Sequence, residues 1–447
     1  MADERDFETI RQAVAQGRFE AALGLIGNPA GEAEALQLAG LALGGLRRFG
    51  EAAGLLAAAS ALAPERFDIL SNLGSALVEL DRFGEALDLF RRAHALAPTN
   101  ARIVANIANL LDFAGALPDA ITAYATAAAL APGDAEIGRN HAMALLRAGR
   151  LAEGWPLFEH RRRAIDPAEA TVPRLDDLSA VAGKRVLLFH EQGFGDTIQM
   201  LRYAPLLAAR GAEVLVRVPP PLARLAAAVP GVGRVVGADE TPALDYQLPL
   251  MSLPLLFGTT LETIPGTTPY LVADPAAVAG WRERLAPLPR PWVGLVWAGS
   301  PEGGLDHRRS MCFADLAPIL AVPAGFVSLQ IGPAAREWAP PGGPAALDAT
   351  PWIADFADTA ALLQALDLLI SVDTSAVHLA GGLGRPVWML DRFSSCWRWL
   401  TGRADSPWYP GLSILRQPHP GQWGPPVAEA ARRLDSPSPP IGRRGPG

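Results

Sequence analysis

Hydrophobic residues in the first third of the chain recur with the spacing of amphipathic helices, and this pattern repeats as a unit. Pro64, Pro98 and Pro132 are spaced by 34 residues and close the segments SALAP, HALAP and AALAP. Related segments, RFGEA twice and then ALPDA, precede these prolines at the same spacing. Because proline stops a helix, the pattern predicts a pair of helices in each unit, with the second helix ending before the proline.

Small residues occupy one position of this repeat, namely Gly40, Gly74 and Ala108. At such a position the two helices of a pair can approach each other closely. The period and the small residues are typical of tetratricopeptide repeats, which are stacked helix pairs. We therefore predict an α-solenoid over residues 1–162, and not a helical bundle with accidental spacing.

The pattern changes after this solenoid. Residues 163–182 lack a helical period, so we interpret them as a linker. From Lys184 on, short apolar strands alternate with amphipathic helices, which indicates parallel sheets with crossover helices. We expect two Rossmann-like halves, 183–287 and 288–435, and a disordered tail at 436–447. The predicted strands are 185–189, 214–218, 235–236, 293–297, 326–329, 368–372 and 387–390.

Composition and charge narrow the function classes. Of the 447 residues 50% are hydrophobic and 19% are charged, which excludes wholesale disorder. The net charge of −7 and the lack of a basic block argue against a nucleic-acid partner. Cys312 and Cys396 form neither a disulfide framework nor a CxxC metal pair. The charged start lacks the apolar run of a signal peptide, and no apolar stretch is long enough to span a bilayer, so we expect a cytoplasmic protein.

The first turn (residues 190–196, HEQGFGD) follows the predicted strand 185–189 and opens a helix. Gly193 and Gly195 allow backbone amides to approach a ligand at the carboxyl end of a parallel strand, where α/β proteins bind ligands. The glycine spacing is not GxGxxG, so it does not indicate a dinucleotide site. Asp196 has two interpretations, a cap at the start of the helix or a base that faces a cleft.

The second turn (residues 373–378, DTSAVH) follows the apolar strand 368–372. Free N–H groups at Thr374 and Ser375 would form an anion site, supported by the helix dipole. His378 lies in the first turn of this helix, where we expect its ring to reach a bound phosphate. The alternative is a histidine packed in the core.

These turns carry a resemblance. The GD of the first turn and the run DTSAVHLAGGLGRPVW from Asp373 resemble the inverting GT-B glycosyltransferases related to bacterial heptosyltransferases, the family 9 group. With repeats in front, the chain resembles bacterial tetratricopeptide-repeat glycosyltransferases and, in domain order, the protein O-GlcNAc transferases. Segments around Arg309 and Gln330 are also typical of this group. Since tryptophan is more often packed in a core or an interface, we leave Trp397 and Trp399 out of the predicted site.

The resemblance implies a GT-B fold of two Rossmann-like halves with a cleft between them. The C-terminal half would bind a nucleotide-sugar and the N-terminal half would face the acceptor. It also implies that Asp196 is the base and that Asp373, Thr374 and His378 contact the donor diphosphate. One departure concerns the start of the first turn, where heptosyltransferases usually have Lys and Ser. This chain has His190 there, followed by Glu and Gln, so heptose is not implied as the donated sugar, and His190 becomes a second candidate base or a group that orients an acceptor hydroxyl.

Glycosyl transfer needs a base near the acceptor hydroxyl and positive charge near the leaving diphosphate. Lys184 is the only lysine, so arginine must supply that charge elsewhere. Arg308 and Arg309 are the candidates, with solvated loop charges as the alternative. A helix N-terminus and arginine need no metal, and the Rossmann region has no Asp-x-Asp motif, so we predict a metal-independent enzyme without a cofactor.

Asn72, Asn106 and Asn140 recur at the repeat spacing. Stacked repeats should place these amides in a ladder along the concave face, where they can bind the backbone of an extended protein or peptide. Such ladders resemble those of the O-GlcNAc transferases. The alternative is that the amides bond within the array.

Three classes of function therefore compete. The first is a glycosyltransferase whose acceptor is a protein recruited by the repeats. The second is a transferase for lipopolysaccharide or another small glycan, in which the repeats serve assembly only. The third is a repeat scaffold whose transferase domain has lost activity.

Overall fold

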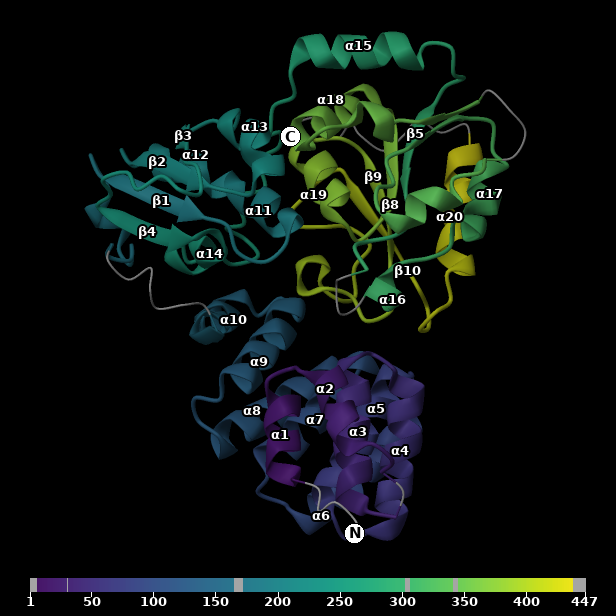
Figure 1. The fold of residues 1–447 in the computed structure, drawn as a ribbon. Coiled ribbons are helices and arrows are strands. Elements are labelled where there is room, and N and C mark those ends of the chain that lie inside the picture. Colours follow the sequence, from purple (N-terminus) through teal and green to yellow (C-terminus); the bar gives the residue numbers. More distant parts are fainter. Residues whose placement is uncertain (1–5, 30, 165–171, 302–305, 341–344, 437–447) are drawn as a thin grey trace. The chain divides into compact units, whose positions relative to one another are not determined.

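The computed structural model describes residues 6–29, 31–164, 172–301, 306–340 and 345–436. Parts of the expected linker (165–171) and of the expected tail (437–447) lie outside the described residues. The chain divides into two compact units, one made mainly of residues up to Ala148 and one made mainly of residues from Gly149 on (Figure 1).

The first unit consists of stacked helix pairs, as the 34-residue period predicts. The pairs are α1 (Phe7–Ala15) with α2 (Phe19–Ile26), α3 (Ala33–Gly45) with α4 (Phe49–Leu62), α5 (Phe67–Glu79) with α6 (Phe83–Leu96) and α7 (Ala101–Phe113) with α8 (Leu117–Leu130), and α9 (Ala135–Arg147) follows them. Pro64, Pro98 and Pro132 each stand just beyond the second helix of a pair, where no further helical N–H is required.

The small residues of the repeat allow the close approach within each pair. A Cβ on Gly40 would be 2.6 Å from Cγ of Leu56, and a Cβ on Gly74 would be 2.7 Å from Cε1 of Phe90. Leu56 and Phe90 belong to the core of the array, and Tyr124 is buried at the same position of the next repeat. The pairs α3–α4 and α5–α6 therefore each place one large buried side chain against one small residue.

The second unit contains α10 (Leu151–Phe158) and two sheets whose strands are all parallel (Figure 1). The four-stranded sheet has the order β3-β2-β1-β4 and consists of β1 (Arg185–Phe189), β2 (Glu213–Arg217), β3 (Val232–Val235) and β4 (Tyr246–Pro249). The six-stranded sheet has the order β10-β9-β8-β5-β6-β7 and consists of β5 (Trp292–Val296), β6 (Gly325–Ser328), β7 (Ala346–Asp348), β8 (Leu368–Val372), β9 (Val387–Asp391) and β10 (Leu412–Arg416).

Helices connect these strands and cover the sheets. They are α11 (Phe194–Met200), α12 (Ala204–Ala208), α13 (Ala223–Ala227), α14 (Leu253–Leu256), α15 (Pro275–Leu285), α16 (Asp306–Arg309), α17 (Ala317–Leu320), α18 (Phe356–Ala365), α19 (Ser375–Gly382) and α20 (Gly424–Asp435). Every residue of β5, β8 and β9 is buried, as expected of parallel strands covered on both faces. The predicted fold class, a solenoid of helix pairs followed by an α/β region with two parallel sheets consistent with two Rossmann-like halves, is confirmed.

The strand order reverses once in each sheet. In the first sheet the chain runs from β1 outward to β3 and then returns to β4 on the other side of β1. In the second sheet it runs from β5 outward to β7 and returns to β8 on the other side of β5. Ligands of open parallel sheets bind at the carboxyl ends of strands beside such reversals. A ligand site is therefore expected at the carboxyl ends of β1 and β8.

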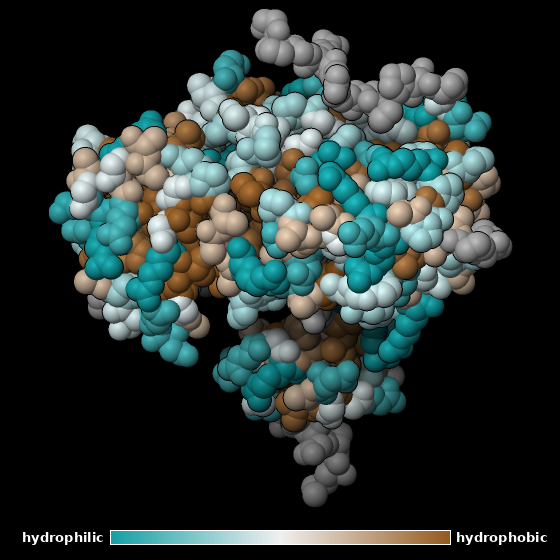
Figure 2. Space-filling model, turned by 90° about the horizontal axis from the view of Figure 1, so that it is seen from above, coloured by the Kyte–Doolittle hydropathy of each residue, from teal (hydrophilic) through white to brown (hydrophobic). Residues whose placement is uncertain are grey.

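Among the described residues, no helix is long and apolar enough to cross a membrane. Figure 2 shows hydrophilic and hydrophobic residues mixed over the visible face of the molecule.

Candidate functional site

The first and second turns lie at the carboxyl ends of β1 and β8, and the helices that they open contact each other. A Cβ on Gly195 of α11 would be 2.7 Å from Cδ2 of His378 and 3.5 Å from Cα of Ser375, both on α19. Figure 1 shows α11 and α19 side by side. Two turns that are far apart in the sequence thus lie next to each other.

The first turn is held together by its own polar groups. The backbone N–H of Gly193, the N-cap of α11, donates to Oδ2 of Asp196 at 2.9 Å. Nδ1 of His190 and the hydroxyl of Thr197 share a hydrogen bond of 2.6 Å. Burial lowers the pKa of His190, so its ring is neutral at pH 7. One carboxylate oxygen of Asp196 therefore serves the capping role, and His190 is a neutral imidazole hydrogen-bonded to Thr197, the residue after Asp196.

The other oxygen of Asp196 forms an ion pair with Arg398, a residue that the sequence analysis did not select. Arg398 lies in a 3₁₀ turn, Trp397–Trp399, which follows β9 in the six-stranded sheet. The two side chains are only 11% and 14% exposed. The signal that could have identified this turn is the run CWRW shortly after a predicted strand, because aromatic and basic residues there stand near the ligand edge of the sheet.

The second turn presents backbone amides and a carboxylate. Thr374 is the N-cap of α19, and its side chain makes no capping bond, so it does not occupy the amides that follow. Its hydroxyl is 3.1 Å from the hydroxyl of Ser371. Burial and the nearby carboxylate of Asp391 raise the pKa of Asp373, while the charges of Arg392 and Arg309 act in the opposite direction. The N-cap side chain thus leaves the first amides of α19 unoccupied, and the anion site at this helix start stays a prediction.

His378 lies deeper than the sequence analysis expected. The residue is 4% exposed, and its Nδ1 shares a hydrogen bond of 2.8 Å with the hydroxyl of Tyr409. The ring stacks on Trp399, with 5.0 Å between centroids. Burial lowers the pKa of His378 to about 3, so the ring is neutral at pH 7. These contacts match the alternative of a histidine packed in the core. The edge of the ring that carries Cδ2 faces Gly195 of α11.

Arg309 and Gln330 have different surroundings. The guanidinium of Arg309 lies against the backbone of Gly299, just after β5, and its Nε donates to Asp306 at 3.1 Å. Its charge also acts to lower the pKa of Asp373, the first residue of the second turn. The amide of Gln330 is buried and bonded to backbone on both sides: Oε1 accepts from Trp297 and Ala298, and Nε2 donates to Ala298 and Ile331. Gln330 thus shapes the loop after β5.

A buried arginine that the sequence analysis did not select contacts Tyr409, the partner of His378. Arg202, which is 2% exposed, donates to the carbonyl oxygens of Gln199 and Trp408, each at 2.9 Å. Its guanidinium lies 4.7 Å from the ring centroids of both Tyr270 and Tyr409. Tyr409 is the partner of His378, so this cluster supports the histidine from the side of the four-stranded sheet.

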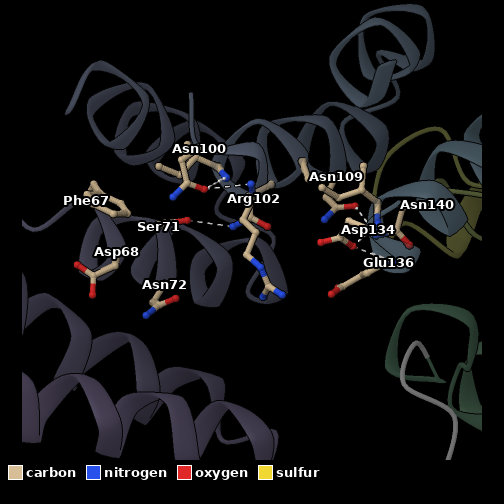
Figure 3. A pocket seen from close by; sticks show the side chains of 14 residues that line it. Phe67, Asp68, Ser71, Asn72, Asn100, Arg102, Asn109, Asp134, Glu136 and Asn140 are labelled. Atoms are coloured by element: carbon tan, nitrogen blue, oxygen red, sulfur yellow. Dashed lines mark hydrogen bonds between the residues drawn. The ribbon is translucent and has the colours of Figure 1, made fainter. Parts of the chain in front are cut away.

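The three repeat asparagines lie together in a second place. Asn72 on α5, Asn106 on α7 and Asn140 on α9 line one hollow of about 200 Å³, here named the repeat hollow (Figure 3). Its other polar lining residues are Asp68, Ser71, Asn100, Arg102, Asn109, Asp134 and Glu136.

Some of these amides bond within the array. Nδ2 of Asn106 donates to Oγ of Ser71 at 3.0 Å, and Nδ2 of Asn140 donates to Oδ1 of Asn109 at 3.4 Å. Figure 3 shows Asn72 on the wall of the repeat hollow without a bond to the other residues drawn. The geometry thus combines both interpretations, since two amides connect neighbouring repeats while all three face the repeat hollow.

Metal ligands do not gather in the described part of the chain: no group of three or more His, Cys, Asp or Glu side chains there could hold a metal ion. The positive charge near the two turns comes from Arg309, Arg392 and Arg398.

Comparisons with known proteins identify the repeats. Two tetratricopeptide-repeat family models match residues 38–101 and 77–139. Among solved structures, MamA from Desulfovibrio magneticus RS-1 is 21% identical with a TM-score of 0.31, covering 36% of this chain and 94% of that one. The thermophilic tetratricopeptide-repeat protein TTC0263 of Thermus thermophilus is 23% identical with a TM-score of 0.33, covering 36% of this chain and 89% of that one.

A curated relative extends beyond the repeats. Protein FlbA of Caulobacter vibrioides is 29% identical over 328 residues, which cover 65% of this chain and 53% of FlbA. The chain therefore spans about half the length of this relative. A match of 328 residues is longer than the whole repeat unit, so it includes part of the α/β region.

Proposed function

We propose that the α/β region is an inverting, metal-independent glycosyltransferase, and that the repeats recruit its protein acceptor. The observation that supports this most strongly is the contact of α11 with α19 at Gly195 and His378. This contact packs the segment that carries Asp196 and His190 on the helix start that carries the amides of the second turn. A transferase of this class needs these two features within one substrate length of each other.

The proposed reaction transfers the sugar in a single displacement. The acceptor hydroxyl attacks the anomeric carbon on the face opposite the nucleoside diphosphate. The new carbon–oxygen bond forms as the bond from the anomeric carbon to the phosphate oxygen breaks, and that electron pair leaves with the diphosphate. The hydroxyl proton passes to Asp196 or to His190, whose neutral ring can accept it at pH 7.

The leaving diphosphate gains negative charge, which the second turn is suited to stabilise. The amides at the start of α19 carry the positive end of the helix dipole, and Thr374 and Ser375 stand beside them. Arg309 adds a full charge next to Asp373. Preorganised groups of this kind can replace a divalent ion at a leaving diphosphate.

A transferase for small glycans, with repeats that serve assembly only, is a second candidate. The bonds of Asn106 and Asn140 to neighbouring repeats favour it, because amides that connect repeats contribute to the array itself. A scaffold without activity is the third candidate, and the capping bond of Asp196 and the packing of His378 are compatible with it.

A thermal-shift panel tests the proposal. The full chain is heated with each of a set of nucleoside diphosphates and nucleotide-sugars, and the same panel is run on His378→Ala and, as a control in the repeats, on Asn72→Ala. At 100 times the dissociation constant a ligand stabilises by about 2.7 kcal/mol, which is readily measured. We expect at least one nucleotide to stabilise wild type and Asn72→Ala, and to stabilise His378→Ala less. If no nucleotide stabilises the wild type, the scaffold is the better description.

A further inference from the structure

Arg398 is the most buried cation that touches the first turn, and its side chain is fixed from several sides. Its Nε donates to Oε1 of Gln199 at 3.1 Å, its Nη1 lies 2.9 Å from Sγ of Cys396, and its guanidinium lies 4.4 Å from the ring centroid of Trp397. Burial lowers its pKa to about 10, so it is still protonated at pH 7. Its Nη2 contacts Asp196.

The next residue along the chain contacts the second turn. Trp399 stacks on His378, and its side chain acts to lower the pKa of Asp373 against the raising effect of burial. The Trp397–Trp399 turn therefore reaches the base candidate with one residue and the anion site with the other. Gly195, the residue before Asp196, lies against Cα of Ser375, so the carboxylate that Arg398 contacts belongs to the segment that packs on the start of α19.

Lys184 and Arg416 are less suited to meet a diphosphate at this place. The single lysine, Lys184, lies before β1 and contacts Asp245 at 3.1 Å, at the amino end of that strand. Arg416 is held by Asp391 at 2.9 Å on the far side of β9. Arg398 has a flat, multidentate donor group of the kind that binds phosphate oxygens, and the carboxylate that holds it is the proposed base.

We propose that the donor diphosphate and the carboxylate of Asp196 compete for Arg398. Arg398 holds the carboxylate when no diphosphate is bound, and the diphosphate takes Arg398 when the donor arrives. The carboxylate is then released to accept the proton of the acceptor hydroxyl. Arg398 is thus the residue that links donor binding to activation of the base, and this inference rests on the proposed function.

Competition of this kind has a measurable signature. An interaction between two sites is reciprocal, so a carboxylate that the diphosphate must displace weakens diphosphate binding. Removal of the carboxylate should therefore strengthen binding of a diphosphate, and this gain should depend on Arg398. A repulsion between Asp196 and the anion that did not involve Arg398 would give the same gain in the presence and in the absence of the arginine.

The experiment is a binding cycle with inorganic pyrophosphate. Isothermal titration calorimetry on the full chain compares wild type, Asp196→Asn, Arg398→Gln and the double variant. Asparagine keeps an acceptor for the N–H of Gly193, so Asp196→Asn preserves the cap. Arg403→Gln is the matched control, since Arg403 pairs with Asp405 at 2.7 Å in the same segment and away from both turns.

We expect Asp196→Asn to bind pyrophosphate about tenfold more tightly than wild type, within the usual range of coupling between sites. Arg398→Gln should bind at least about tenfold more weakly, as expected when a charge-assisted pair is lost. The double variant should show no gain over Arg398→Gln, and Arg403→Gln should match wild type. Thermal unfolding of each variant confirms that it is folded, and Arg398→Lys, which keeps the charge, replaces Arg398→Gln if the latter does not fold.

Two failures can be told apart. If wild type binds pyrophosphate but Asp196→Asn gains nothing, or if the gain persists without Arg398, the competition is refuted and the diphosphate site of the proposed function stands. If neither pyrophosphate nor any nucleoside diphosphate binds to any variant, both the competition and the proposed function are refuted.

Discussion

The backbone of Gly195 lies directly against the imidazole ring of His378. A Cβ at residue 195 would be 2.7 Å from Cδ2 of the ring and 3.3 Å from Nε2. The ring has little room to retreat, because the hydroxyl of Tyr409 holds its Nδ1 and Trp399 stacks on its face. Only glycine at position 195 therefore allows α11 and α19 to pack this closely.

Gly195→Ala is expected to force these two helices apart. Overpacking of this kind costs about 1–3 kcal/mol of the free energy of unfolding. Gly280→Ala is the control, since Gly280 lies in α15 with open space around its Cα, and alanine there should stabilise by about 0.5–1 kcal/mol. Urea unfolding of both variants measures the difference, and equal stabilities would contradict the packing described.

Asp196→Asn is expected to lower turnover at least about 100-fold, because it removes one of the two proposed bases. Nucleotide binding should persist, since the residue donates nothing to a phosphate. Initial rates and nucleotide affinity are measured on the same preparation. Unchanged turnover would leave Asp196 as the cap of α11 alone.

His378→Gln is expected to make the free energy of unfolding depend less on pH below pH 7. In the unfolded chain the pKa of a histidine is about 6.5, and burial lowers that of folded His378 to about 3. As the pH falls below about 6.5, the unfolded state binds a proton that the folded state does not, so stability is lost. Between pH 7 and pH 5 this loss is about 2 kcal/mol. Urea unfolding at both pH values should show a drop that is smaller in the variant by about this amount, and identical drops would mean that His378 is not buried as neutral imidazole.

Chelation of metal ions is expected to leave the transferase rate unaltered. In the proposed reaction, the amides at the start of α19 and the nearby arginines take the place of a divalent ion in stabilising the leaving diphosphate. The rate with the nucleotide-sugar found in the thermal-shift panel is measured with and without EDTA. Strong inhibition that Mg²⁺ or Mn²⁺ reverses would refute the metal-independent reaction.

Replacement of Asn72, Asn106 and Asn140 together by alanine is expected to weaken the binding of protein acceptors tenfold or more. Each amide–peptide hydrogen bond contributes roughly 0.5–1.5 kcal/mol, so the loss of three raises the dissociation constant of the acceptor by more than a factor of ten. Donor hydrolysis should continue at the wild-type rate. If glycosylation of protein acceptors is unchanged, the repeat hollow is not where they bind.

The single variants separate recruitment from array stability. Asn106→Ala and Asn140→Ala remove bonds between neighbouring repeats, so each should lower the free energy of unfolding by about 0.5–1.5 kcal/mol. Asn72→Ala removes no bond to the other residues drawn in Figure 3, and its unfolding should match wild type.

The parts of the fold that were predictable have local causes. The prolines and small residues at a fixed period define the helix pairs without any knowledge of distant contacts, and β1 and β8 have the bounds that their apolar runs indicate. The strands β4, β7 and β10 were not predicted. β4 ends in proline, β7 has three residues at the sheet edge, and β10 follows a Pro-Gly pair and contains serine, so none of them forms an uninterrupted apolar run.

The candidate site was predictable only where one segment carries the signal. The two turns combine glycine or small polar residues with a helix start, and both were found. The sequence analysis did not select Arg398 and Arg202, because their roles depend on partners far away in the sequence. Arg398 pairs with Asp196, and Arg202 donates to Trp408. Hydrophobic periodicity cannot reveal such pairs, because it relates residues within one helix or strand and not residues of distant segments.

The single lysine has a practical consequence. Lys184 is 45% exposed and stands before the first residue of β1, whereas the first turn begins after the last residue of this strand. A strand of five residues places the two ends roughly 16 Å apart. An amine-reactive fluorophore therefore attaches to one side chain only, besides the N-terminal amine, and it does so away from Asp196 and His190. The natural sequence thus offers a labelling position for fluorescence measurements without the introduction of a cysteine.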